Sequence, residues 1–122
     1  MNNGKEEMRD FIKEAEELLV AARHGLNMGD HNSCFSKSYY AMVLSIKASL
    51  SLLEEHFGKT EIEILSRGVE KVFGDIHDQI LLIDQGTGFI VNEKEARDCL
   101  EEAGNFVQKS KNHLEARMQA KG

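Results

Sequence analysis

The stretch that decides the fold runs from Cys34 to Glu55 and reads CFSKSYYAMVLSIKASLSLLEE. On a helix, residues three, four and seven apart share a face. One stripe of this stretch then carries aromatic and aliphatic side chains: Phe35, Tyr39, Met42, Val43, Ile46, Leu50 and Leu53. A second stripe on the far side carries Lys37, Tyr40, Leu44, Lys47 and Ser51. Because a surface helix usually has a single apolar stripe, we expect this helix to lie centrally, with its own bundle on one side and a neighbour, a ligand or a second subunit on the other.

The composition indicates an all-α protein. The chain has 122 residues, of which 41% are hydrophobic, and it contains no proline and no tryptophan. A chain of this length forms one domain with a real core, and without proline only glycines are left to interrupt its helices. We therefore expect a single domain over residues 1–122, folded as an antiparallel up-and-down bundle of four to five helices.

The net charge and the N-terminal sequence bear on whether the protein binds nucleic acid broadly, spans a membrane or is secreted. The formal net charge of −6 argues against a broad basic surface for nucleic acid, although a local basic groove remains compatible with it. No run approaches the length of a membrane span, and the N-terminus, MNNGKEEMRD, does not resemble a signal peptide. We expect a cytoplasmic protein whose two cysteines, Cys34 and Cys99, are free buried thiols, with a disulfide or metal pair as the alternative.

Helical periodicity and capping residues predict the helix ends. The first helix covers residues 5 to about 27, followed by a short turn with Gly25 and Gly29 around it and Asp30 as the N-cap of the central helix. The central helix ends near Phe57, with Gly58 as the stop. The last helix begins at an Asn92–Glu95 capping pair and runs to about Arg117.

Between these helices the sequence predicts a third helix that begins at the Thr60–Glu63 capping box. Gly74 and Asp75 interrupt it before a short further helical segment, and Gln85 to Phe89, QGTGF, is expected to be a loop. The periodic apolar residues predict a shared core: Phe11, Leu18, Phe35, Tyr39, Met42, Ile46, Leu50, Ala103 and Val107.

Few residues are arranged as a catalytic or metal-binding group would be. The five histidines are scattered, no pair has metal-ligand spacing on one helix, and HExxH is absent. The densest group of ligand-type residues, Asp75, His77, Asp78 and Asp84, is explained more simply by helix caps and solvated side chains. We expect no metal and no cofactor.

The second stripe of the central helix is the strongest candidate for a binding surface. Lys37 and Lys47 bracket the ring of Tyr40 and the side chain of Leu44, which suits a phosphate or a stacked base. A helix–helix or subunit interface, with the lysine heads reaching water, explains the same residues. We expect a homodimer in solution with Tyr40 and Leu44 at or beside the interface, because exposed apolar area needs a cover and a two-fold copy needs only one self-complementary patch.

The segment Lys37-Ser38-Tyr39-Tyr40-Ala41-Met42 resembles the Arg-Ala-Tyr-Tyr-Ala-Met/Phe signature of HEPN domains. The similarity extends in outline to an amphipathic first helix, a glycine-bearing turn and a last helix, residues 95–114, with the pair Phe106-Val107. This resemblance implies a four- to five-helix bundle, commonly dimeric. It also implies a gene often placed beside a minimal nucleotidyltransferase, in a toxin–antitoxin or defence pair.

Many HEPN domains are metal-independent ribonucleases that use an Arg, a spacer of four to six residues, and a His near the start of the last helix. The resemblance gives the His the role of general acid or base and the Arg that of a phosphate clamp. Here Arg97 is the only arginine in that region, and the positions where the histidine would stand are Glu102, Ala103 and Gly104. We therefore expect no catalytic residue, and we keep Arg97 as a candidate ligand contact.

Three functions follow as hypotheses. The first is a non-catalytic dimeric HEPN-like module that partners a minimal nucleotidyltransferase or binds nucleotide or RNA weakly. The second is a HEPN ribonuclease toxin with a displaced active site that uses His77 or His113 with a basic residue of the other subunit. The third is a helical adaptor without a ligand.

Overall fold

Three long helices make up the part of the chain that can be described. The structure, a computed structural model, describes residues 4–57, 67 and 91–120. Helix α1 spans Gly4–Asn27, α2 spans His31–Phe57 and α4 spans Glu93–Ala120. Within these ranges every regular element is a helix, which confirms the predicted all-α class. The predicted third helix and the loop Gln85–Phe89 lie outside the described residues.

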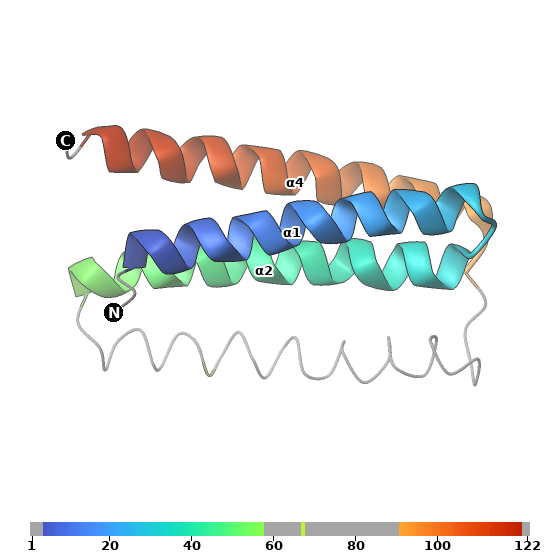
Figure 1. Ribbon diagram of the computed structural model, residues 1–122, viewed down its shortest axis with the longest axis horizontal. Helices are drawn as coiled ribbons and strands as arrows, with labels where there is room; N and C mark the ends of the chain where they lie inside the picture. Colours follow the sequence, from blue (N-terminus) through green and yellow to red (C-terminus); the bar gives the residue numbers. More distant parts are fainter. Residues whose placement is uncertain (1–3, 58–66, 68–90, 121–122) are drawn as a thin grey trace.

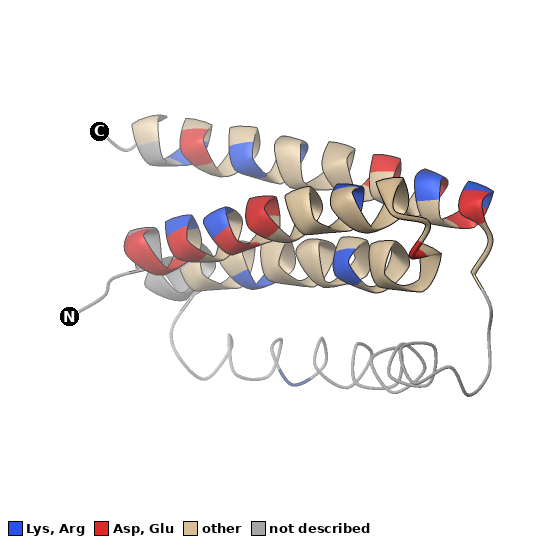
Figure 2. Cartoon of the chain, turned by 45° about the vertical axis from the view of Figure 1, so that its right-hand side comes forward, with Lys and Arg blue, Asp and Glu red and all other residues tan. Residues whose placement is uncertain are grey.

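The helices pack side by side along their lengths (Figure 1). Helix α1 runs opposite to α2, as the short connection between them predicts, and α4 runs in the same direction as α2. Charged residues of both signs cluster along α1 and α4, whereas α2 is largely uncharged (Figure 2). The low charge of α2 agrees with the central place that its two stripes predict.

The α1–α2 hairpin follows the predicted turn chemistry. Gly29 adopts a left-handed φ of 80°, a conformation that side chains disfavour, and its N–H donates to the Leu26 carbonyl at 3.1 Å. Asp30 then caps α2, since its Oδ1 accepts the N–H of Ser33 at 3.1 Å. A Cβ on Gly25 would lie 3.3 Å from the Asp30 carbonyl oxygen, so glycine permits the close approach of α1 to the start of α2.

The start of α4 is fixed in the same way. Asn92 Oδ1 accepts the Glu95 N–H at 2.8 Å, and Glu95 Oε1 accepts the Asn92 N–H at 3.5 Å. This reciprocal pair is the predicted capping box. The start of α4 is also tied to the start of α2, because the N–H of Val91 donates to Asn32 Oδ1 at 3.0 Å.

The core consists of three layers stacked along the bundle, and all three described helices contribute to each layer. The layer at the α1 N-terminal end contains Met8, Ile12, Ala48 and Leu114. The middle layer contains Ala15, Ala41 and Val107, and the layer at the other end contains Ala22, Cys34, Val91, Ala96 and Leu100. Helix α2 contributes only small residues to these layers, Cys34, Ala41 and Ala48, so its backbone can lie close to α1 and α4.

The buried face of α2 differs from the predicted one. The fully buried side chains of α2 are small and recur at alternating spacings of four and three: Cys34, Ser38, Ala41, Ser45 and Ala48. The predicted large stripe of Phe35, Tyr39, Met42, Ile46 and Leu50 is half-buried. Phe11 and Leu18 are also half-buried and pack against the core from its edge, while Ala103 and Val107 are buried as predicted.

Candidate functional site

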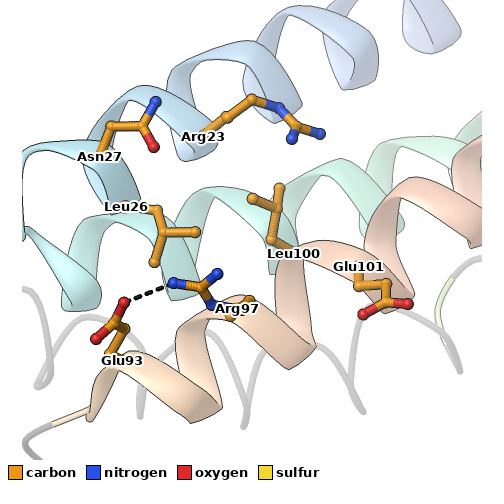
Figure 3. A pocket seen from close by; sticks show the side chains of 7 residues that line it. All are labelled: Arg23, Leu26, Asn27, Glu93, Arg97, Leu100 and Glu101. Atoms are coloured by element: carbon orange, nitrogen blue, oxygen red, sulfur yellow. Dashed lines mark hydrogen bonds and ion pairs between the residues drawn. The ribbon is translucent and has the colours of Figure 1, made fainter.

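A groove lies between the end of α1 and the start of α4 (Figure 3). Its volume is about 710 Å³, within the range of small-molecule sites. Helix α1 supplies Arg23, Leu26 and Asn27 to its lining, and α4 supplies Glu93, Arg97, Leu100 and Glu101. The two leucines lie between the polar side chains of the two helices, so the groove has an apolar middle and polar margins.

Helical spacing places the polar residues of the groove. Arg23 and Asn27 are one turn apart on α1, and Glu93, Arg97 and Glu101 follow one another at single-turn spacing on α4. Near mid-length the two helices are bridged by Lys111 Nζ and Glu16 Oε2, 3.2 Å apart. The groove lies at the other end of this seam, where α1 ends and α4 begins.

The two arginines of the groove have different surroundings. Arg97 pairs with Glu93 at 2.5 Å, and both side chains are 61% exposed. Because water screens the two charges, the pair makes only a small net contribution to stability. Arg23 is exposed and has no hydrogen bond or ion pair with any described residue. Its guanidinium therefore keeps its hydrogen-bonding capacity for a ligand.

The four candidate residues of α2 lie apart from this groove, and none of them lines it. Lys37 Nζ donates to Ser33 Oγ at 2.5 Å, and Lys47 is exposed. Leu44 is half-buried and packs against the middle core layer with Leu18, so it lies at the edge of the core and not on its far side as expected. Tyr40 is half-buried. Of the predicted site residues, the structure therefore places Arg97 in a groove and leaves the α2 residues on another surface.

Sequence reasoning missed Arg23 and Asn27 on α1 and Glu93 and Glu101 on α4. The single-turn spacings were visible in the sequence, but they are also the spacings of any solvated helix face. Only the antiparallel packing of α1 on α4 brings the two sets together. That packing depends on tertiary contacts, which no local pattern encodes.

Comparison with models of protein families shows to which family the chain belongs. A family model of the HEPN domain matches residues 8–114 of the chain. The chain belongs to the HEPN family. Comparisons with curated proteins and with solved structures gave no significant match. The match spans most of α1, all of α2 and most of α4, so the described part of this HEPN domain contains both the groove and the tyrosine-bearing helix.

In this HEPN domain the positions five to seven residues beyond Arg97, where a spacer of four to six residues would put the histidine, lie within α4 and carry no imidazole. Glu102 is exposed, Ala103 is buried in the bundle, and a Cβ added at Gly104 would have nothing within 4 Å. A histidine placed at 103 would be enclosed in the core. Arg97 therefore has no imidazole partner at the spacing that the family's ribonucleases use.

The two cysteines of the HEPN domain are free and poorly suited to act as nucleophiles. Burial raises the pKa of Cys99 to about 11, with further contributions from the charges of Cys34 and Glu102. Burial also raises the pKa of Cys34 above its ordinary value. Both thiols are therefore protonated at neutral pH, and the thiolate is the reactive form.

Metal-ligand groups and membrane spans were also sought in the described helices. Among residues 4–57, 67 and 91–120 no three histidine, cysteine or carboxylate side chains gather as a metal would require. The cluster of Asp75, His77, Asp78 and Asp84 lies outside those residues. None of α1, α2 and α4 has a stretch with both the length and the apolar character of a membrane-crossing segment.

Proposed function

We propose that this HEPN domain is a non-catalytic binding module whose α1–α4 groove takes a nucleotide or a short stretch of RNA in the cytoplasm. The observation that carries the proposal is the convergence of Arg23 and Arg97 from two helices on one groove with an apolar middle. Guanidinium groups bind phosphate through paired N–H donors, and the leucines offer a surface for a base or sugar.

Glu93 and Glu101 lower the net charge of the groove to zero, and this limits the affinity. The exposed Arg97–Glu93 pair contributes less than about 1 kcal/mol, so a phosphate can displace the Glu93 carboxylate from Arg97. Glu93→Gln should therefore tighten phosphate binding several-fold. The two carboxylates also favour ligands with few phosphates over polyphosphates, because like charges repel in the groove.

Calorimetric titration of AMP, GMP and a short single-stranded RNA tests the groove. Charge-assisted hydrogen bonds contribute about 1.5–3 kcal/mol, so Arg23→Gln and Arg97→Gln should each weaken binding roughly tenfold. Arg9→Gln is the matched control, since Arg9 is an exposed arginine of α1 that does not line the groove. Equal losses in the control and the groove variants, or no binding at millimolar ligand, would refute the groove assignment.

Ribonuclease activity should be absent. General acid–base catalysis contributes about 10²–10⁴-fold, and the histidine that would supply it does not follow Arg97 at the family's spacing. Metal-free protein incubated with single-stranded RNA should leave it intact. Robust cleavage that His77→Ala or His113→Ala abolishes would instead establish a displaced active site.

The proposal includes a homodimer formed through the outer face of α2, with Tyr40 and Lys47 at the contact. HEPN domains commonly dimerise, and an isologous contact needs a single self-complementary patch. Light scattering should give a dimer for the wild type and a monomer for Tyr40→Glu with Lys47→Glu. Leu44 is left unchanged because it packs against the core. Lys94→Glu, at a residue whose side chain is 87% exposed on α4, is the control.

The partner in this proposal is a minimal nucleotidyltransferase, in a toxin–antitoxin or defence pair. Support comes from family membership. Co-expression with a nucleotidyltransferase encoded beside this gene should yield a complex that survives size-exclusion chromatography. Separate elution of the two proteins at micromolar concentration would refute the pairing.

A further inference from the structure

Both thiols of the chain lie at one junction between α2 and α4. Cys34 Sγ donates to the Ala96 carbonyl at 3.6 Å, across the helix–helix contact. Cys99 Sγ donates in the opposite direction, to the Phe35 carbonyl at 3.9 Å. Phe35 is the neighbour of Cys34 in the chain, and Ala96 is one helical turn before Cys99. Each sulfur therefore contacts the main chain within a turn of the other cysteine.

The packing at this junction lets the two backbones come close. A disulfide requires Cα atoms about 4.4–6.8 Å apart, closer than the axes of most packed helices. Here the small residues Cys34 and Ala96 are both 0% exposed and belong to the same core layer. The charge of Cys34 also contributes to the raised pKa of Cys99, which agrees with their proximity.

We propose that Cys34 and Cys99 join in an intramolecular disulfide that fastens the start of α4 to the start of α2 under oxidising conditions. The structure shows the reduced state, in which both cysteines are free. The chain has no other cysteine, so no third thiol competes for either sulfur. The bond would form whether or not the α1–α4 groove binds a ligand.

The oxidant is a low-molecular-weight disulfide such as glutathione disulfide, and the exchange balances in two steps. The partly exposed Cys99 loses its proton and attacks one glutathione sulfur, which breaks the glutathione S–S bond and releases one glutathione thiol. Cys34, buried beside it with 0% exposure, then loses its proton and attacks the Cys99 sulfur, which releases the second glutathione. Two electrons pass from the cysteine pair to the glutathione disulfide, which takes up both protons.

The thiol environments predict a slow exchange in both directions. The pKa of Cys99 is raised to about 11, so only a small fraction is thiolate at neutral pH, and formation should speed up as the pH rises toward that value. A thiol of high pKa is also a poor leaving group, so reduction should be slow as well. Once formed, the disulfide would be a long-lived covalent link between α2 and α4.

Oxidation of the folded chain in a glutathione disulfide buffer at pH 8.5, followed by alkylation and trypsin digestion, tests the bond. The expected product is a monomer lighter by two hydrogens, in which peptide 24–37 is linked to peptide 98–109. Its melting temperature should exceed that of the same sample reduced again, because the bond closes a long loop of the unfolded chain.

Two isosteric variants serve as controls. Cys34→Ser should take up one glutathione at Cys99 and form no linked peptide, and Cys99→Ser should gain neither the link nor the added thermal stability. Wild-type protein that yields only glutathione adducts or chain-to-chain dimers would overturn the proposal. A linked peptide that appears only in urea would also overturn it, because the native packing would then keep the sulfurs apart.

Discussion

Replacing Ala41 by leucine tests which face of α2 lies inside the bundle. Ala41 is 0% exposed and packs against Ala15 of α1 and Val107 of α4, in the middle layer of the core. Leu50 belongs to the large apolar stripe that periodicity alone places inside, and it is half-buried. Comparing the loss of stability at Ala41 and at Leu50 therefore shows which of the two faces of α2 lies inside the bundle.

The expected magnitudes follow from this packing. Leucine at 41 adds three carbon atoms where three helices meet, and overpacking of this kind destabilises by about 1–3 kcal/mol. Leu50→Ala would lose about 2–5 kcal/mol at a fully buried site, so a half-buried leucine should lose roughly half as much. Ala41→Leu should thus cost about as much as Leu50→Ala, although it enlarges a side chain.

Urea melts followed by circular dichroism measure both changes. With a denaturant slope of about 2 kcal/mol per molar, a loss of 2 kcal/mol lowers the midpoint by roughly 1 M. Ala116→Leu is the matched control, because Ala116 is an exposed residue of α4 and surface changes stay within about 0.5 kcal/mol. If Ala41→Leu behaves like the control while Leu50→Ala loses more than about 3 kcal/mol, the large stripe is the true interior and the described packing is wrong.

Three further outcomes follow from single contacts. Asn92→Ala removes the cap of α4 and should cost about 1 kcal/mol in urea melts, while Asn92→Asp, which keeps an acceptor for the Glu95 N–H, should cost much less. Gly29→Ala forces a side chain into a left-handed φ of 80° and should destabilise by about 1 kcal/mol, and Gly104→Ala, a helical position with open space, should not. Folding raises the pKa of Cys99 from 9.0 to about 11, so the folded state favours the protonated thiol. The stability that this thiol contributes should therefore be complete below pH 9 and be lost between pH 9 and 11. Cys99→Ala should abolish that part of the pH dependence.

The helix ends could be predicted because their signals are local. Asp30, Gly29 and the Asn92–Glu95 pair act through hydrogen bonds and backbone conformation within a few residues, so sequence spacing alone identifies them. The positions of α1, α2 and α4 followed from those ends within a few residues at most.

The buried face of α2 could not be predicted because hydrophobicity ranks large residues above small ones. The interior face is formed by serine, alanine and cysteine. These side chains are small, so they allow the neighbouring helices to approach closely. Periodicity shows that a stripe exists, but size complementarity between helices decides which stripe faces inward. The groove was missed for a related reason, since Arg23 and Arg97 are far apart in the chain and meet only through the α1–α4 packing.

The family signature Tyr39-Tyr40-Ala41 has a structural meaning in this fold. Ala41, its smallest member, is the one fully buried in the core, and the hydroxyl-bearing Ser38 one turn before it is also buried. The two tyrosines are half-buried on either side of that seam, and burial raises the pKa of Tyr39. Tyr39 belongs to the large stripe of α2 and Tyr40 to the stripe that carries Lys37 and Lys47. The signature therefore combines a close helix contact at its alanine with two aromatic rings on opposite flanks of α2. A larger residue at Ala41 would displace α2 and with it both tyrosine rings. A substitution at Tyr40 would alter only the surface that the proposed dimer uses.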